Sequence, residues 1–436
     1  MKTDEGLIRA IGVRGLTAGM VNYTIGAGIF VLPALVAARV GAAAPVVYVI
    51  CAVAIGLILL CFADAGSRVS LSGGTYAYAE KAFGPYVGFI VATSLWFGSA
   101  VISSAAVANV FMDMLAQLVP ALGTSMVRAA ILVLTYAGFA AINIRGVKIG
   151  SRAVQTVTLA KLAPLLILVA FGIFAISTPN LAWPGMPSGA EIKRGSIILI
   201  FAFLGTESAL SVSGEVKDPS RTVPRAIIAT LVLVTLMYMS IQFVAQGVLG
   251  ADLATSTKAP LAETAKRILG SGGQTLVLIG AAISTFGYVG GDMLASPRGL
   301  YALGRDNLLP SIIGSVSEKY RTPYVAILIH AGFCAAFAVS GSFAGLMVIA
   351  TLATMIVYLI CCAATIKLQR MNLRTEGAEP FQLSGGPVIP VIACIIVIWL
   401  MTSSTRQEFI AIAAMLAVET ILFFAMRARA VLPRPA

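Results

Sequence analysis

Long apolar runs, separated by short polar segments, occupy almost the whole chain. A run of about 20 apolar residues is long enough to cross a lipid bilayer as an α-helix. Several runs are longer, and we expect those helices to be tilted or to extend past the bilayer. The pattern predicts about twelve membrane spans, at residues 14–38, 44–66, 86–118, 127–143, 153–178, 194–213, 223–249, 273–303, 323–339, 343–366, 387–403 and 407–426. Residues 1–436 are therefore expected to form a single all-α transmembrane domain.

Two of the predicted spans are broken in the middle. Gly26-Ala27-Gly28 interrupts the first span, and Gly205-Thr206-Glu207 interrupts the sixth. A break at membrane depth exposes backbone N–H and C=O groups, which is tolerated only where they line a cavity or meet a ligand. A pair of glycine-interrupted spans at matching places in two halves of a chain indicates the binding site of a transporter.

The spans fall into two sets of five, at about 14–178 and about 194–366. An odd number of spans per set turns the second set upside down, which produces a 5+5 inverted repeat with a broken helix first in each half. Two extra helices, at about 387–426, would follow the repeats. Two more polar helices are expected outside the spans, one within Ser72–Pro85 on the inner surface and one at Lys258–Leu269 on the outer side.

Composition agrees with a membrane protein: 59% of the 436 residues are hydrophobic, 11% are charged, and the mean hydropathy is +0.95. The formal net charge of +12 needs no nucleic acid to explain it. With a cytoplasmic N-terminus, 21 of the 30 Lys and Arg residues lie in inner loops, 8 lie in outer loops, and Lys161 lies within a span. This positive-inside bias predicts that both termini lie in the cytoplasm. The protein is expected in the cell (inner) membrane. The first apolar run is too long for a signal peptide.

Catalytic and metal-binding patterns are missing from the sequence. The six cysteines lie in apolar runs without metal-ligand spacing, and they suggest no disulfide framework. His330, the only histidine, is expected to be structural and to have no metal-ligating partner. No nucleophile–base pair or phosphate-binding loop occurs, so we expect neither an enzyme nor a cofactor.

Four segments together resemble the amino acid–polyamine–organocation (APC) superfamily of transporters. They are Thr24–Phe30, the Gly-Gly-x-Tyr helix in Ser72–Pro85, Phe201–Glu207 with the following Glu215–Arg221, and Ser296–Asp306. Their order and spacing also match, and the sixth span is similar to that of the arginine/agmatine antiporter and of bacterial broad-range amino acid transporters. The resemblance implies the leucine-transporter fold and alternating access.

The two breaks predict how a substrate backbone is bound. Unwound backbone at Ile25, Gly26, Ala27 and Gly28 offers N–H groups, and the half-helix after it points its positive dipole end at the same place, which suits a carboxylate. The alternative is that these glycines only allow the helices to pack closely, as small residues do in membranes. Free carbonyls at Phe201, Ala202, Phe203 and Leu204 suit an ammonium group. In the superfamily an aromatic residue here gates the site, and Phe201 is favoured over Phe203.

Coupling is expected to involve two ionisable residues within the spans. Glu207 lies in the second break, where burial favours proton binding and release; its alternative role is a protonated hydrogen-bonding partner in the unwound segment. Lys161, by resemblance, takes the place of the sodium ion of sodium-coupled relatives and reaches Ser284 or Thr285. Its alternative role is a permanent ammonium group that holds the site open. The protein is then expected to be sodium-independent.

Asp292 is the residue that bears on the substrate side chain. The antiporter has a tryptophan at the matching position, packed on its substrate, so a carboxylate here favours a cationic side chain or a polyamine. Asp292 could instead pair with Lys161. Ser99 and Ser103 share a helix face in the third span and are expected near the same pocket.

These observations predict a secondary active amino acid transporter, coupled to protons as a symporter or working by amino acid exchange, with a cationic substrate as one option. A neutral or broad-range amino acid or a polyamine is the alternative, and a non-transporting membrane receptor is a distant one. Whether the protein forms a homodimer is left open.

Overall fold

The computed structural model describes residues 11–69, 75–145, 151–183, 185–205, 216–373, 380, 381, 383 and 385–431. The side chains of residues 22, 23, 151–161, 219, 220 and 429–431 are not among the described parts. Apart from one β-bridge between Ile11 and Val216, this part of the chain contains no β-structure. The predicted all-α class is confirmed.

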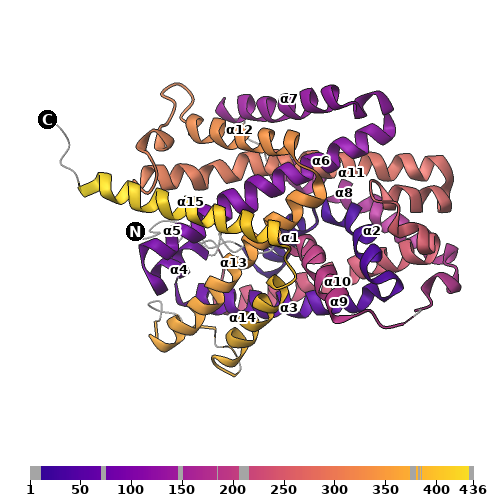
Figure 1. Ribbon diagram of the computed structural model, residues 1–436, viewed down its shortest axis with the longest axis horizontal. Coiled ribbons are helices and arrows are strands. Elements are labelled where there is room, and N and C mark those ends of the chain that lie inside the picture. The colour runs from indigo at the N-terminus through magenta and orange to yellow at the C-terminus, as the bar shows by residue number, and fades with distance from the viewer. Residues whose placement is uncertain are drawn as a thin grey trace.

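Figure 1 shows the order of the helices along the chain. The first half contains α1 (Val13–Thr24), α2 (Gly28–Val40), α3 (Ala44–Arg68), α4 (Thr75–Phe83), α5 (Pro85–Thr93), the π-helix η2 (Ser94–Val101), α6 (Ile102–Leu118), the 3₁₀-helix η3 (Pro120–Gly123), α7 (Ser125–Ile144) and α8 (Ser151–Gly172). The second half contains α9 (Gly189–Ile200), the 3₁₀-helix η6 (Phe201–Phe203), α10 (Pro219–Leu249), α11 (Pro260–Arg305), α12 (Tyr324–Ser340), α13 (Phe343–Arg370), α14 (Val388–Met401) and α15 (Arg406–Val431).

Seven helical stretches among the described residues are long and apolar enough to cross a membrane. They are Gly28–Arg68, Pro85–Leu118, Ser125–Ile144, Arg221–Ala254, Pro260–Arg305, Phe343–Arg370 and Arg406–Ala428. Shorter apolar helices occur at Leu162–Ala175, Tyr324–Ser340 and Val388–Met401. Between its ends, an α-helix satisfies its backbone hydrogen bonds internally, which is the condition for crossing lipid.

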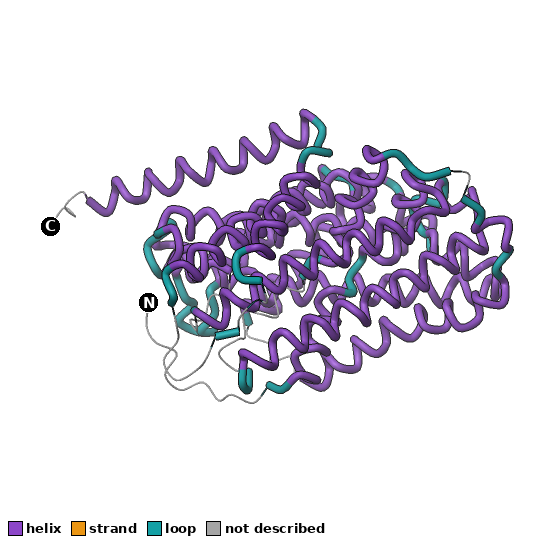
Figure 2. Tube along the Cα trace, turned by 90° about the horizontal axis from the view of Figure 1, so that it is seen from below, coloured by secondary structure: helices purple, strands orange, loops and turns teal. Residues whose placement is uncertain are grey.

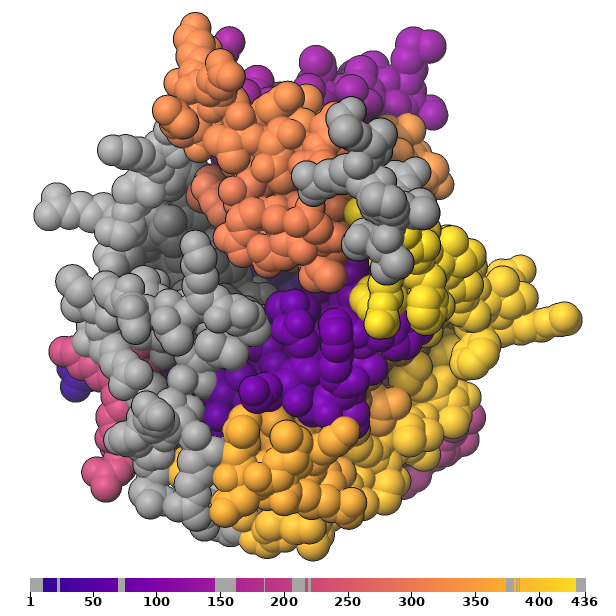
Figure 3. Space-filling model, turned by 90° about the vertical axis from the view of Figure 1, so that its left-hand side faces the viewer, coloured from indigo at the N-terminus to yellow at the C-terminus, as the bar shows by residue number. Residues whose placement is uncertain are grey.

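Both polar helices expected outside the spans form. In α4, Ala77, Tyr78 and Ala82 are buried, and the helix packs on α13. In the end-on view of Figure 3, the violet surface that includes α4 and α5 is bordered by the yellow surface of α15. The second polar helix is the first part of α11, which bends at Gly270 (φ 69°) before the long apolar part begins.

The helices pack so that segments distant in the sequence lie side by side. α10 packs on α1 and α3, whereas α11 packs on α2, α6 and α8. α7, α12 and α11 run next to one another across the top of Figure 1. The last helix, α15, stands apart from most of the bundle in Figure 2, and it exposes large apolar side chains such as Phe409 and Ile421, as expected of a lipid-facing helix.

Candidate functional site

The first helix is interrupted where the sequence predicts it. α1 ends at Thr24 and α2 begins at Gly28, with three non-helical residues between them. The Gly26 N–H donates to the Thr24 carbonyl at 2.9 Å. The N–H groups of Ala27, Gly28 and Ile29 have no hydrogen-bond partner among the described residues. These groups form the positive, N-terminal end of α2, in a place where Ala27 and Ile29 are only 1% exposed.

The two breaks are in direct contact with each other. A Cβ atom built on Gly28 would lie 3.2 Å from the Cα of Ala202, closer than side chains normally pack. Glycine at position 28 is therefore what allows the second break to approach the first. On the other side, a Cβ on Gly26 would lie 3.6 Å from the ring of Tyr288 in α11. The first break is thus enclosed between Ala202 and Tyr288.

The second interruption also begins where the sequence predicts it. α9 ends at Ile200, a 3₁₀ turn covers Phe201–Phe203, Leu204 is extended, and Gly205 has φ 97°, a conformation that favours glycine. Thr206 and the coupling candidate Glu207 lie outside the described residues. The carbonyl ends of α9 and η6 therefore face the first break.

Tyr238 of α10 connects the two breaks, and the sequence analysis missed it. Its hydroxyl lies 3.0 Å from the carbonyl oxygen of Thr24 and 3.0 Å from that of Ala202, and the side chain is fully buried. A signal for it exists in the sequence: Tyr238, Gln242 and Gln246 follow one another at four-residue intervals along an otherwise apolar helix, so they form one buried polar stripe.

The two candidate gating residues have different surroundings. Phe201 packs edge-on against Phe343 at the start of α13, with ring centroids 5.8 Å apart. Phe203 packs edge-on against Tyr238 at 5.7 Å and is 1% exposed, so it belongs to the core beneath the breaks. Phe201 therefore bridges η6 and α13, whereas Phe203 is held within the core.

The serines expected near the side-chain pocket lie at an irregular place in the third span. Ser99 is part of the π-helix η2, and Ser103 follows in α6, where it is 5% exposed. The N–H of Ile102 reaches the carbonyl of Phe97, five residues back. This wider turn changes the register between the two serines from that of the regular helix assumed in the sequence analysis.

Lys161 lies on a helix that packs tightly against α11. Pro164 of α8 fills the space that a Cβ on Gly280 would need, and eight residues later Gly172 lies beside Ile268. The two helices therefore run antiparallel, and Lys161 and Ser284 each lie one turn from the Pro164 contact in the same direction. The Lys161 side chain is outside the described residues.

The two hydroxyl groups expected to meet Lys161 differ in their hydrogen bonding. The hydroxyl of Ser284 is buried without a partner in the described part of the chain. Thr285 donates to the carbonyl of Ala281 within its own helix, at 2.7 Å. Ser284 is therefore the better candidate to meet an ammonium group from α8.

Asp292 is engaged by partners that the sequence analysis did not expect. Its Oδ2 lies 2.9 Å from Nε2 of His330, and its Oδ1 accepts a hydrogen bond from Ser296. Trp96 donates to Nδ1 of His330 at 3.2 Å, and the Sγ of Cys334 lies 3.5 Å from its Nε2. The expectation that His330 has no metal-ligating neighbour is wrong, because one ligand atom each of Asp292, His330 and Cys334 lies within 4.8 Å of the others.

Comparison with known proteins decides the family. A sequence model of the family described as "Amino acid permease" matches residues 11–426, nearly the whole chain. The chain belongs to the amino acid permease family. The permease family is part of the APC superfamily, so the resemblance found in the sequence is confirmed.

Among known proteins, the permease is 27% identical to the "Methylthioribose transporter" of Bacillus subtilis, over 97% of this chain and 94% of that protein. It is 29% identical to the "Serine/threonine exchanger SteT" of the same organism, over 74% of this chain and 75% of that protein. An "Uncharacterized transporter" of Mycobacterium tuberculosis, Rv1979c, is 27% identical over 92% of this chain and 89% of that protein. The permease is thus a multi-pass membrane transporter of a small molecule and not an enzyme.

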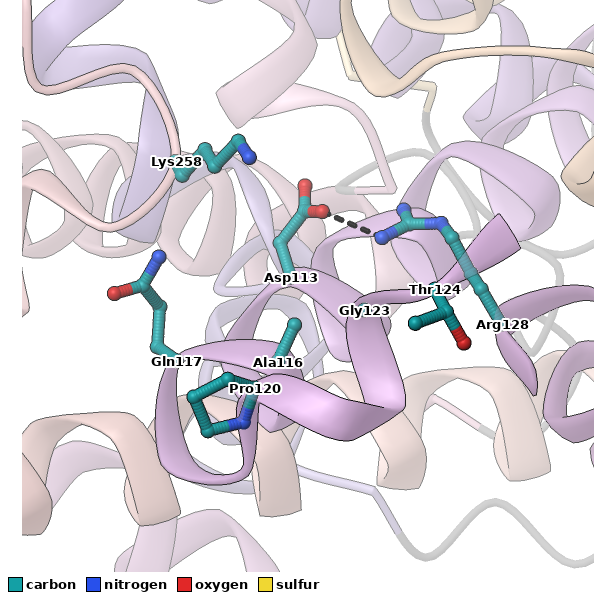
Figure 4. Close-up of a pocket in the computed structure, with 8 residues that line it drawn as sticks. All are labelled: Asp113, Ala116, Gln117, Pro120, Gly123, Thr124, Arg128 and Lys258. Atoms are coloured by element: carbon teal, nitrogen blue, oxygen red, sulfur yellow. Dashed lines mark hydrogen bonds and ion pairs between the residues drawn. The ribbon is translucent and has the colours of Figure 1, made fainter. Parts of the chain in front are cut away.

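An open pocket of about 370 Å³ lies away from the breaks, where α6 meets η3 and α7. In Figure 4, Asp113 and Arg128 join across this pocket, at 2.7 Å, and Lys258 points toward Asp113 from the other side. A neighbouring pocket shares Gln117 and Lys258 and adds further charged groups. Neither pocket includes a residue of either break, so both are separate from the site described above.

Proposed function

We propose that this permease is a secondary active transporter of amino acids that works by alternating access, with its substrate bound at the two breaks. The observation that carries the proposal is the set of N–H groups at Ala27, Gly28 and Ile29, buried and without a partner among the described residues, at the N-terminus of α2. Buried N–H groups are rarely left unsatisfied, and an anion is the ligand that a helix N-terminus favours. The α-carboxylate of an amino acid supplies one.

The second break supplies the partner for the amino group. The carbonyls of Phe201 and Ala202 accept hydrogen bonds from the Leu204 N–H and the Tyr238 hydroxyl, respectively. A carbonyl oxygen has two lone pairs, so each can also accept a hydrogen bond from an ammonium group. Because Gly28 lies against Ala202, the carboxylate and ammonium sites that we propose are next to each other, as one α-amino acid requires.

A neutral side chain on the substrate agrees better with the structure than a cationic one. Asp292 was the only residue that favoured a cation, and both its oxygens are bonded within the protein, to His330 and Ser296. The relative that exchanges serine and threonine also carries a neutral substrate by its name. Cationic amino acids and polyamines remain as alternatives for the experiment to separate.

The membrane arrangement that we propose has twelve spans, of which ten form a 5+5 inverted repeat and two follow it. The protein would lie in the cell (inner) membrane with both termini in the cytoplasm. Its support is the matching interruption of α1–α2 and α9–η6, each at the start of one set of five apolar segments.

Coupling without sodium is proposed on the placement of Lys161 and Ser284 at the same level of the α8–α11 contact. An ammonium group reaching the unpartnered hydroxyl of Ser284 would occupy the place of a cation beside the first break. Glu207, whose surroundings lie outside the described residues, is the second candidate. Proton symport and amino acid exchange are both compatible with this arrangement.

Counterflow in proteoliposomes tests the proposal. Vesicles loaded with unlabelled L-serine are diluted into labelled L-serine, with L-alanine, L-lysine and putrescine as competitors, with and without sodium. We expect sodium-independent counterflow that alanine inhibits and that lysine and putrescine do not. Binding without counterflow would instead support a receptor, and inhibition by lysine would restore the cationic substrate.

A matched pair of glycine variants tests the site. In Gly28→Ala the new methyl group meets Ala202, and overpacking of this kind costs about 1–3 kcal/mol, so we expect roughly tenfold or greater loss of apparent affinity. In Gly138→Ala of α7, nothing lies within 4 Å of the added methyl group, and transport should be unchanged. Equal behaviour of the two variants would refute the site.

A further inference from the structure

Three thiol groups meet where α3, α13 and α14 pack together. Each of these helices packs on the other two, and they lie next to one another in the lower half of Figure 1. Cys61 comes from α3, Cys362 from α13 and Cys394 from α14. The thiol of Cys362 forms hydrogen bonds with the thiols of both Cys61 and Cys394. We call these three residues the thiol cluster. Their positions in the sequence, far apart and without metal-ligand spacing, do not predict it.

Contacts beside the thiol cluster join the three helices at this level. The hydroxyl of Thr365 in α13 lies 3.0 Å from the carbonyl oxygen of Cys61 in α3. The Sγ of Cys394 lies 4.0 Å from the carbonyl oxygen of Leu359, which belongs to the turn of α13 that carries Cys362. Both neighbouring helices are therefore placed against the same part of α13.

A buried carboxylate fastens the same three elements a short distance further along. Asp64 follows Cys61 by about one turn of α3 and is fully buried. Its Oδ2 accepts a hydrogen bond from the side chain of Gln369 at the end of α13, at 3.0 Å, and one from the N–H of Leu383 ahead of α14, at 3.4 Å. Arg68 bonds to its other oxygen. Groups that are already held in place lose little conformational entropy when they bind a ligand, so the thiol cluster is preorganised.

The thiol cluster offers sulfur atoms as ligands, and sulfur selects soft metal ions such as Cu(I) and zinc. A structural zinc site takes four ligands in a tetrahedron. Cys361, next to Cys362 in the chain, does not supply the fourth, because its thiol is directed to the carbonyl oxygen of Thr75 in α4, at 3.7 Å. Three sulfur atoms suit Cu(I), a soft ion that accepts two or three ligands.

The charge of a monovalent ion also suits a buried group of thiols. A metal ion is bound by a thiolate, so the ion that enters must displace a proton. When Cu(I) replaces the proton of one thiol, one positive charge enters and one leaves, and the buried charge does not change. Burying an uncompensated charge would be costly, and this exchange avoids that cost.

We propose that Cys61, Cys362 and Cys394 form a binding site for one Cu(I) ion and that the bound ion inhibits transport. One thiol gives its proton to the solvent and binds as a thiolate, the other two bind as neutral thiols, and no atom is oxidised or reduced. In the proposed topology the site lies toward the cytoplasm, where reducing conditions keep cysteines as thiols. Binding of the ion stands apart from the proposed function, whereas inhibition rests on it.

The inhibition follows from which helices the ion would join. α3 packs on α9 and α10, and Cys51 of α3 hydrogen-bonds to the carbonyl of Ser196 in α9 at 3.4 Å, so α3 is attached to the second broken helix. α13 packs on α6 and η2 of the third span. Alternating access requires the helices that carry the breaks to move against the others. An ion bonded at once to α3, α13 and α14 restrains this movement.

The first test measures copper binding in the absence of transport. Purified permease in detergent, under nitrogen and with ascorbate, competes for Cu(I) with the coloured chelator bathocuproine disulfonate. We expect a single equivalent in the wild type, and binding weaker by about tenfold or more in Cys362→Ala, which is about 1.4 kcal/mol or more. Cys51→Ala is the matched control, because it removes an equally buried thiol of α3 outside the thiol cluster and should bind copper as the wild type does.

The second test measures the effect of copper on L-serine counterflow. In the wild type and in Cys51→Ala we expect Cu(I) to slow counterflow, and the chelator to restore it. In Cys362→Ala the rates with and without copper should agree within about twofold. If Cys362→Ala does not fold, Cys394→Ala replaces it, because Cys394 is the least buried member of the thiol cluster and should tolerate the loss of one sulfur atom.

The outcomes separate this inference from the proposed function. Copper affinity that is unchanged in Cys362→Ala and Cys394→Ala overturns the site. Copper that is lost in Cys334→Ala instead overturns it in favour of the group formed by Asp292, His330 and Cys334. Counterflow at full rate with copper bound to the wild type overturns the inhibition. Absence of counterflow with every amino acid tested overturns the proposed function and the inhibition, and leaves the copper site measured in detergent standing.

Discussion

The Tyr238 hydroxyl is the contact most open to a decisive substitution. Tyr238→Phe removes one oxygen from a fully buried position and leaves the carbonyls of Thr24 and Ala202 without their shared donor. The hydroxyl has one hydrogen and donates to only one of the two carbonyls at any moment, so the substitution removes one hydrogen bond. The Thr24 carbonyl keeps the hydrogen bond from the Gly26 N–H, so the loss falls on the carbonyl of Ala202, and leaving a buried acceptor unsatisfied costs about 1–3 kcal/mol. If this bond orders the two breaks for binding, a loss of about 1.4 kcal/mol is about tenfold in apparent affinity.

The assay is L-serine counterflow over a range of concentrations, together with thermal unfolding in detergent with and without serine. We expect Tyr238→Phe to weaken apparent affinity about tenfold and to reduce the stabilisation by serine. Tyr48→Phe is the matched control, because Tyr48 is equally buried but its hydroxyl donates to the side chain of Gln242, at 3.2 Å. It should lower thermal stability and leave affinity within about twofold. If the two variants weaken affinity equally, or if neither does, the role given to Tyr238 is refuted.

Three further predictions follow from other parts of the structure. Lys161→Ala should abolish serine accumulation driven by a pH gradient while serine binding persists by calorimetry, and retained accumulation would remove Lys161 from coupling. Gly98→Ala should lower the unfolding temperature in detergent, because its methyl group would overlap Ala353, at a cost of about 1–3 kcal/mol; Gly332→Ala, with open space around it, should match wild type. The pKa of Glu191 is lowered from its ordinary 4.5, first by the hydrogen bond from the Ser188 N–H and then by that from the Ser188 hydroxyl. The ionised Glu191 side chain, which is exposed and caps the N-terminus of α9, therefore stabilises this helix at neutral pH. The stabilisation is lost as the pH falls through the lowered pKa. Glu191→Gln should therefore unfold earlier than wild type at pH 7 and together with it near pH 3, and a constant difference across this range would refute the cap.

Local patterns predicted what depends on neighbours in the sequence. The apolar runs locate the helices, and the glycines locate the interruptions after Thr24 and at Gly205, because helix length and backbone freedom are properties of short segments. The short polar helix at α4 and the helix before Gly270 were found in the same way.

Partners from distant parts of the chain were not predictable from one sequence. Trp96 and His330 are 234 residues apart, and Tyr238 is 214 residues from Thr24. Asp292 shows the consequence, because a carboxylate looks the same in a sequence whether it faces a ligand or a histidine. The packing of α12 on α11 brings His330 beside Asp292, and no local pattern in the sequence predicts it.

The π-helix η2 affects how this permease should be aligned with its relatives. A π-turn contains one residue more than an α-turn, so a span that includes Ser94–Val101 is out of phase with a relative whose third span is regular throughout. One residue of offset rotates every later side chain by about 100° around the helix axis. A gapless alignment of this span would therefore assign Ser103 and the residues after it to the wrong helix face. Specificity inferred from such an alignment would compare residues that do not occupy equivalent positions, and a one-residue gap within η2 corrects it.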